Sequence, residues 1–154
     1  MKNRRIALGA DHNGVELKSH LKKKLKELGY QVYDAGTQGK GSVDYPDIAK
    51  KLGKWVQKGK VEFGVLICGT GIGMAMAANK LKGIRAATCN SLYEARMARK
   101  DNNANILTMG GRILAPAIAE EILQVFLETP FEGGRHERRV RKIHQMEEKE
   151  GKKS

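Results

Sequence analysis

The feature that most constrains the fold is an alternation of short apolar runs with longer segments of helical periodicity. The apolar runs are continuous, which is typical of strands buried on both faces of a parallel sheet. They predict strands at Ile6–Gly9, Tyr30–Tyr33, Gly64–Ile67, Ile84–Thr88 and Asn105–Met109. The segments between and after them predict six helices. The first lies at 14–28, the second runs from Pro46 through Val56, and the third follows the glycine-rich turn after Cys68 and ends at about Lys80. The others lie at Leu92–Lys100, at Pro116–Glu128 and at 134–148.

We therefore expect an α/β fold, a three-layer Rossmann-like domain with a five-stranded, mostly parallel sheet. The whole chain, residues 1–154, fits one domain, with the final helix at about 134–148 and a frayed tail at 149–154. In this class, ligands bind outside the carboxyl ends of the strands. The residues that follow the strands are therefore the first candidates for a functional site.

Cysteine content and apolar patterning indicate the compartment. No run of about 18 apolar residues is present, and the first residues do not have the pattern of a secretory signal. Cys68 and Cys89 are the two cysteines, too few for a disulfide framework. Cys89 ends a strand without a glycine loop and is interpreted as a small buried residue, and no set of residues with zinc-ligand spacing occurs. We expect a cytoplasmic protein without a membrane partner.

Cys68 is the strongest candidate for chemistry, since it follows a buried strand and opens the segment CGTGIG before a helix. A thiol at a helix start feels the positive end of the dipole, so we expect its pKa to fall and a thiolate to be accessible. Gly69, Gly71 and Gly73 let a ligand approach the backbone, whose amides, with Thr70, can bind an anion or a developing oxyanion. On spacing alone, a buried structural cysteine beside a tight turn explains the segment equally well.

Charged side chains at strand ends and on the last predicted helix are further candidates. Arg135 and Arg139 are four residues apart, so they share a helix face and can hold a phosphate, although a solvated basic helix fits as well. Asp11 and His12 at a strand end act on a ligand or cap the next helix. Arg112 follows two glycines at another strand end, which makes it a ligand candidate.

Five segments carry a family resemblance, in the order GADHNGVELK, VDYPDIA, GVLICGTGIGMAMAANKLKGIRAA, NNANILTMGGR and FEGGRHERRV. Together they resemble the ribose-5-phosphate isomerase type B family, which includes the galactose-6-phosphate isomerase subunits, from about Ile6 to Ile143. The resemblance implies an aldose–ketose isomerase that interconverts ribose 5-phosphate and ribulose 5-phosphate through an enediolate, without metal or other cofactor. It also implies a homodimer, or a dimer of dimers, whose subunits share active sites.

The same resemblance implies roles for individual residues. Cys68 becomes the base that moves a proton between C2 and C1, while Thr70 and the amides of Gly69, Gly71 and Gly73 hold the enediolate oxygen. Contacts with the sugar phosphate are implied for Asp11, His12, Tyr45, Asn102, Arg112, Arg135 and Arg139. Arg135 and Arg139 take the phosphate, with help from His12.

Position 101 departs from the family pattern. Family members commonly carry a histidine here, before the paired asparagine, and it is assigned to opening the sugar ring, whereas this chain has Asp101. A carboxylate can act as a base, but it is an acid near neutral pH only if its pKa rises well above about 4. Asp101 itself, His12 or His136 opens the ring, or the ring opens spontaneously and another substrate is preferred.

Two other functions stay open. One is isomerisation of a six-carbon substrate such as allose or galactose 6-phosphate, which pocket depth near Gly39–Asp44 and Asp101 would decide. The other is a non-catalytic phosphate-binding or nucleic-acid-binding protein, motivated by the net charge of +12. Residues 1–28 carry +5 and residues 135–154 carry +4, so the surplus forms no single patch, and aromatic residues are only 5%. Nucleic acid is therefore the least favoured partner.

Overall fold

The computed structural model of the protein describes residues 4–39 and 41–151. Its core is one sheet with the strand order β2-β1-β3-β5-β4, in which every neighbouring pair is parallel. The strands are Arg5–Ala10 (β1), Gln31–Asp34 (β2), Phe63–Cys68 (β3), Ala86–Thr88 (β4) and Ile106–Gly110 (β5). This arrangement confirms the predicted α/β class with a five-stranded sheet, and the described strands are all parallel.

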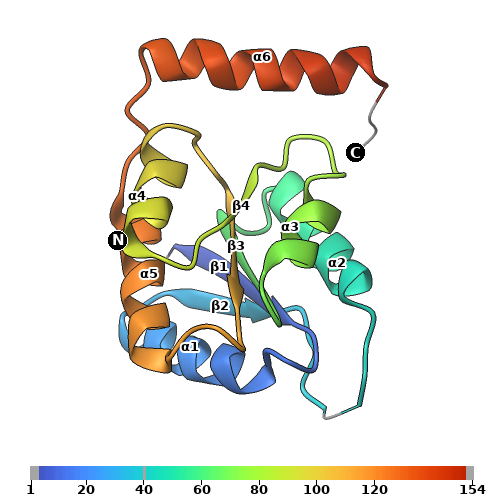
Figure 1. The fold of residues 1–154 in the computed structure, drawn as a ribbon, viewed down its shortest axis with the longest axis vertical. Helices are drawn as coiled ribbons and strands as arrows, with labels where there is room; N and C mark the ends of the chain where they lie inside the picture. The colour runs from blue at the N-terminus through green and yellow to red at the C-terminus, as the bar shows by residue number, and fades with distance from the viewer. Residues whose placement is uncertain (1–3, 40, 152–154) are drawn as a thin grey trace.

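Helices cover both faces of the sheet (Figure 1). Those of the layers are Val15–Glu27 (α1), Tyr45–Gln57 (α2), Ile72–Ala78 (α3), Leu92–Lys100 (α4) and Pro116–Glu128 (α5). Helices α1, α4 and α5 pack on one face, and α2 and α3 pack on the other. No helix of the described residues has the length and apolarity needed to cross a bilayer.

The apolar strand runs are explained by burial on both faces of the sheet. Successive side chains of a strand point to opposite faces. In β3, Val65 and Ile67 pack in the layer of α1, α4 and α5, whereas Leu66 and Cys68 pack in the layer of α2 and α3. The thiol of Cys68 therefore faces the α2/α3 layer, at the end of its strand.

Some elements are shorter than the sequence predicts. Strand β4 begins at Ala86, because the backbone N–H of Arg85 donates to Asn105 Oδ1 instead of continuing the ladder. Helix α3 ends at Ala78, and the Asn79 side chain then exchanges two hydrogen bonds with the backbone of Ala86. These side-chain bonds replace backbone pairing at the turn between α3 and β4.

The last helix, α6 (Arg135–Lys149), lies outside both layers, across the amino ends of the strands (Figure 1). Glu147 Oε2 accepts the N–H of Gly83, and His144 Nε2 lies 2.8 Å from Arg85 Nη1, so α6 contacts the segment that precedes β4. Its bounds agree with the predicted 134–148. Of the tail predicted to fray, Lys149 still belongs to the helix, and residues 152–154 lie outside the described part of the chain.

Candidate active site

The carboxyl ends of the central strands carry one group of candidate residues, called here the carboxyl-edge group: Asp11, His12, Tyr45, Cys68, Gly69, Thr70, Gly71, Gly73 and Arg112. Backbone hydrogen bonds join its parts. The N–H of Asp11 donates to Ile67 O at 3.0 Å, and the N–H of Arg112 donates to Gly69 O at 3.1 Å. The structure thus brings the segments after β1, β3 and β5 side by side, as the parallel sheet predicted.

Cys68 ends β3 with only 5% of its surface exposed, and its sulfur faces the glycine loop. The N–H of Gly71 donates to Cys68 Sγ at 3.2 Å. Gly71 has φ +86°, and a Cβ there would lie 2.8–2.9 Å from the backbone of Met109. The buried hydroxyl of Thr108 donates to Gly71 O at 2.8 Å. Only glycine fits this close approach, and it directs an amide hydrogen at the thiol, where it would stabilise a thiolate.

Thr70 and Tyr45 are further polar candidates at this loop. Thr70 is exposed, and its Oγ1 accepts the N–H of Ile72 at 3.2 Å. A Cβ on Gly73 would lie 2.7 Å from ring atoms of Tyr45, so the ring lies against this glycine. The phenol of Tyr45, a 39% exposed residue, therefore stands next to the start of α3.

Asp11 and His12 differ in burial although they are adjacent. Asp11 is 4% exposed, and its Oδ1 accepts the N–H of Asn13 at 2.9 Å. His12 is exposed, and its Nδ1 accepts the N–H of Val43 at 3.4 Å. An Nδ1 that accepts leaves the proton of the neutral ring on Nε2, which can donate to a ligand. A cavity of about 410 Å³ lies beside His12, between α1 and the loop at Gly111.

Asn90 belongs to this edge, although sequence reasoning gave it no role. Its Nδ2 donates to Thr70 O at 3.3 Å, and its Oδ1 accepts the N–H of Gly110 at 3.0 Å. It therefore ties the loop after β3 to the end of β5. The signal was present, because Asn90 follows a predicted strand as Asp11 and Cys68 do.

Cys89 behaves as the sequence predicted. It is 1% exposed, and burial, with a smaller effect of Glu94, raises its pKa to about 12. A thiol in that state is not a nucleophile or base near neutral pH. The two cysteines therefore differ in environment, since only the sulfur of Cys68 receives a backbone amide from a glycine loop.

A second group of candidates, Asp101, Asn102, Arg135 and Arg139, lies at the opposite, amino ends of the strands and is called here the amino-edge group. Helix α4 runs back from the carboxyl end of β4 to the start of β5, so Asp101 follows it at this edge. The backbone O of Asn103 accepts Arg85 Nε at 2.8 Å, which places this turn beside the start of β4.

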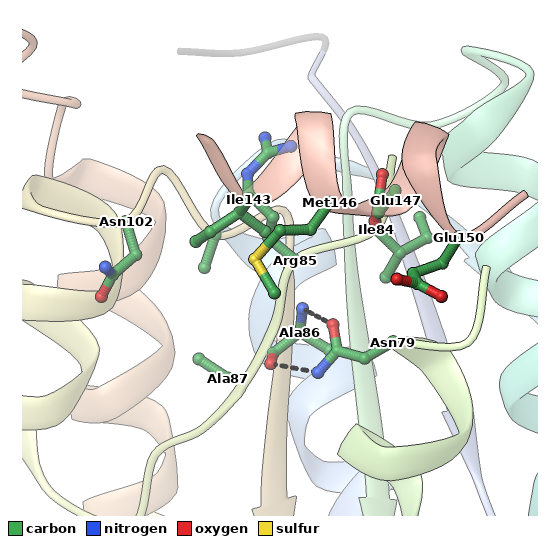
Figure 2. Close-up of a pocket in the computed structure, with 11 residues that line it drawn as sticks. Asn79, Ile84, Arg85, Ala86, Ala87, Asn102, Ile143, Met146, Glu147 and Glu150 are labelled. Carbon is green, nitrogen blue, oxygen red and sulfur yellow. Dashed lines mark hydrogen bonds between the residues drawn. The ribbon is translucent and has the colours of Figure 1, made fainter. Parts of the chain in front are cut away.

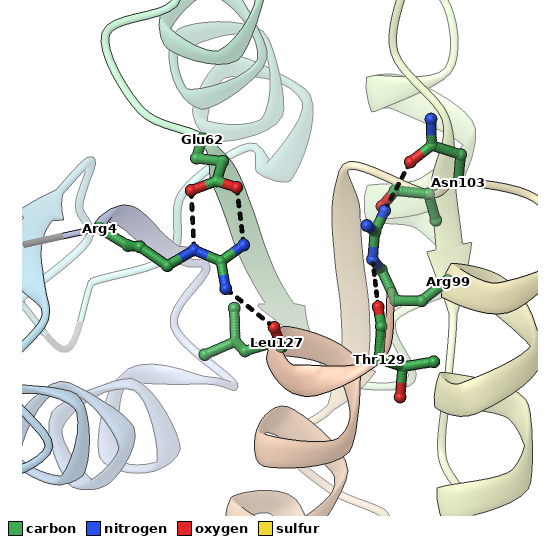
Figure 3. A network of polar contacts seen from close by, with 7 residues as sticks. Arg4, Glu62, Arg99, Asn103, Leu127 and Thr129 are labelled. Atoms are coloured by element: carbon green, nitrogen blue, oxygen red, sulfur yellow. Dashed lines mark hydrogen bonds and ion pairs between the residues drawn. The ribbon is translucent and has the colours of Figure 1, made fainter. Parts of the chain in front are cut away.

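The turn after α4 is held by a buried guanidinium (Figure 3). Arg99 donates to Asn103 Oδ1 at 2.9 Å, to Ala104 O at 2.6 Å and to Thr129 O at 3.3 Å. Its charge also lies over the rings of Phe63 and Phe126. This network fixes the backbone that presents Asp101 and Asn102.

Beside Asn102, a cavity of about 450 Å³ opens between α6 and β4 (Figure 2). Its lining is mostly apolar, with Met146 and Ile143 of α6 over Ala86, and with Arg85 among its polar members. Arg135 and Arg139 are exposed on the first turns of α6. The phosphate candidates are thus presented by a surface helix and not by the sheet.

One chain does not bring the two groups together. Helix α4, whose length of nine residues corresponds to about 13 Å, separates the edge that carries Cys68 from the edge that carries Asp101. Neither cavity is lined by Cys68. Across the part of the chain that the structure describes, no cluster of three or more His, Cys, Asp and Glu side chains could hold a metal ion.

Comparison with known proteins agrees with this architecture. A family model described as Ribose/Galactose Isomerase matches residues 6–143. The chain is similar to ribose-5-phosphate isomerase B of Escherichia coli, with 40% identity over 95% of this chain and 98% of that protein. It is also similar to D-erythrulose-4-phosphate isomerase of Pectobacterium atrosepticum, with 42% identity over 94% and 96% of the two chains.

Among solved structures, that of ribose-5-phosphate isomerase B from Clostridium thermocellum matches with a TM-score of 0.94 and 46% identity, over 96% of this chain and 99% of that one. Fold, sequence and the length of the match agree in all three comparisons. The chain therefore belongs to the ribose/galactose isomerase family, a family of sugar-phosphate isomerases.

Proposed function

We propose that this protein interconverts ribose 5-phosphate and ribulose 5-phosphate, with Cys68 as the base. The observation that carries the proposal is the N–H of Gly71, which donates to Cys68 Sγ at 3.2 Å at the end of a buried strand. A thiolate stabilised there is a base at the edge of the sheet where α/β enzymes bind ligands. Both the E. coli relative and the C. thermocellum structure carry the name of this activity.

In the proposed reaction, the Cys68 thiolate takes the proton from C2 of the open-chain aldose, and negative charge develops on O1. A proton then passes from O2 to O1, and the thiol returns its proton to C1. The carbonyl group has moved from C1 to C2, and no atom is gained or lost. Thr70 and the amides of Gly69 and Gly73, which belong to the segment that follows Cys68, stabilise the enediolate oxygen. The Gly71 amide stabilises the thiolate, because it already donates to Sγ.

The remaining candidates bind and prepare the substrate. Asp11, which is buried and accepts the N–H of Asn13, contacts a sugar hydroxyl, as does Tyr45. His12, through Nε2–H, and Arg112 contact the substrate near its phosphate. Arg135 and Arg139 neutralise the phosphate, since a pair of guanidinium groups suits its geometry. Asp101 and Asn102 contact the sugar, with Asp101 in the position that acts on the ring.

We propose a homodimer, because the candidate residues lie at opposite edges of the sheet. Strand β4 forms one edge of the sheet. Exposed apolar side chains lie around it: Met76 of α3, Tyr93 of α4, and Ile143 and Met146 of α6. A two-fold axis beside β4 and perpendicular to it places the carboxyl edge of one subunit next to the amino edge of the other. Each active site then takes Cys68 from one subunit and Arg135 and Arg139 from its partner.

The whole chain acts in this proposal as a single isomerase domain in the cytoplasm. Cys68 and Cys89 are both free thiols, and a reducing compartment keeps them so. The base, the anion-binding amides and the phosphate arginines supply the groups that the proton transfer requires, so the proposal includes no metal or other cofactor.

A coupled assay with purified protein, ribose 5-phosphate and excess EDTA tests the proposal. We expect turnover in EDTA, and the Asp101→His variant run beside the wild type tests which group opens the ring. A higher rate in the variant assigns ring opening to position 101. If ribose 5-phosphate is not converted, while allose 6-phosphate, galactose 6-phosphate or erythrulose 4-phosphate is, the substrate assignment is wrong. If none is converted, the isomerase proposal fails.

A further inference from the structure

Asp101 belongs to a small polar cluster at the junction of α4 and α6. His136 is buried, with 8% of its side chain exposed, and its Nε2 lies 3.4 Å from Asp101 Oδ1. The same nitrogen lies 3.8 Å from Glu132 Oε1. In the tautomer with its proton on Nε2, the imidazole can donate toward the Asp101 carboxylate, whereas a lone pair on Nε2 would meet negative charge.

The backbone of this junction is fixed without His136. The N–H of Asp101 continues the helical bonding to Met97 O at 2.9 Å, and Arg99 holds the next turn through Asn103, which has φ +49°. Glu132 is anchored to the end of α4 as well, since its N–H donates to Lys100 O at 3.0 Å. The rotamer of Asp101 is therefore the part that depends on a side-chain contact.

We propose that His136 is a positioning residue, which holds the Asp101 carboxylate in one orientation toward the substrate, while Glu132 lies against the same Nε2 atom of the imidazole. This inference rests on the proposed function, in which Asp101 contacts the sugar. About a third of the Asp101 side chain is exposed, so one oxygen contacts His136 and the carboxylate still reaches outward. Asp101 and His136 then act as one unit in catalysis.

A purely structural role for His136 makes a different prediction. If the imidazole only attaches α6 to α4, its loss displaces Arg135 and Arg139, which weakens phosphate binding and raises KM. If it orients Asp101, its loss lowers kcat, because misplacement of a catalytic group by about 1 Å costs up to roughly 100-fold in rate. The division of the effect between kcat and KM therefore separates the two roles.

The experiment measures kcat and KM for ribose 5-phosphate in the wild type, His136→Leu, Asp101→Asn and the double variant. We expect His136→Leu to lower kcat about 10-fold with KM within about 2-fold, and the double variant to be no slower than Asp101→Asn. His136→Gln, whose amide can donate to Asp101, recovers part of the rate. His144→Leu, on the same helix but against Arg85, leaves both constants unchanged.

Size-exclusion chromatography and circular dichroism show whether each variant keeps its fold and assembly. Additive losses in the double variant, an unaffected Asp101→Asn, or a rise in KM with unchanged kcat in His136→Leu would each overturn the inference and leave the isomerase function standing. Absence of turnover in the wild type would overturn the proposed function, and the role of His136 with it.

Discussion

The two edges of the sheet present functional side chains in different ways. At the carboxyl edge, Asp11 and Cys68 are almost completely buried, and the loop after β3 is tied by backbone bonds and by the Thr108 and Asn90 side chains. At the amino edge, Asn102, Arg135 and Arg139 are exposed, on a helix end and on a helix that lies outside the layers. In the proposed mechanism, the base therefore lies in the buried core, and the anchoring charges lie on the surface.

In the proposed mechanism, this difference explains why one chain does not complete the site. A parallel sheet brings the residues after its strands together, but a residue that follows a returning helix lies at the far edge. Arg135 and Arg139 are exposed on α6, where a guanidinium stays hydrated until a partner such as a phosphate reaches it. In the proposed homodimer, the carboxyl edge of a second copy supplies that surface.

The largest expected effect is at the carboxyl edge. Replacing Cys68 by Ala removes the proposed base, and we expect kcat to fall about 10²–10⁴-fold, because a positioned base contributes that much. Cys89→Ala is the matched control, since burial raises the pKa of this thiol to about 12 and it takes no part. Rates come from the coupled assay. Near-normal turnover in Cys68→Ala would remove this thiol from the mechanism.

The next effect tests whether the two edges meet between subunits. Arg135→Ala/Arg139→Ala, expected to raise KM, is co-expressed with Cys68→Ala, so that half of random dimers carry one defect in each subunit. Such a dimer has one intact site and one doubly defective site, and the mixture should recover about a quarter of wild-type kcat/KM. The control is a mixture of the two variants that were purified separately and kept from exchanging subunits. If mixing restores nothing, the two groups do not share a site across subunits.

The smallest effect compares an ion pair at each edge. Burial alone would raise the Asp34 pKa, but hydrogen bonds from Lys18, the Gly36 N–H and Lys22 outweigh it and lower the pKa from 3.8 to about 2. The charged form therefore stabilises the fold above pH 3.8, and this contribution is lost as the pH falls through about 2. We expect Asp34→Asn to lower the free energy of unfolding by about 1–2 kcal/mol at pH 7.

Denaturant unfolding between pH 3 and pH 7 measures the difference, which should shrink toward the acid end. Glu62→Gln is the counterpart at the amino edge, where Glu62 pairs with Arg4 and is half exposed (Figure 3). We expect it to cost less than about 1 kcal/mol, as exposed pairs do. Equal costs at the two edges would contradict the expectation that the more buried Asp34 pair contributes more to stability than the half-exposed Glu62 pair.

Much of the carboxyl edge could be predicted from the sequence. Continuous apolar runs predicted the strands, and in a parallel sheet the residues after strands must meet, so Asp11, Cys68 and Arg112 were placed correctly along the same edge. What local patterns did not predict is the buried Lys18, 1% exposed within a lysine-rich helix. Its partners Asp34 and Thr37 belong to the end of β2 and to the segment after it, and only the fold brings them to Lys18.

Periodicity and strand-end position are local properties of the chain, so the order of elements, the parallel sheet and the chemical types available could be predicted without a structure. Two other features become visible only in the folded chain: Asp101 and the α6 arginines lie at the edge opposite Cys68, and His136 lies against Asp101. The direction in which α4 returns across the sheet and the docking of α6 on its end depend on contacts between residues far apart in the sequence, which no local pattern encodes.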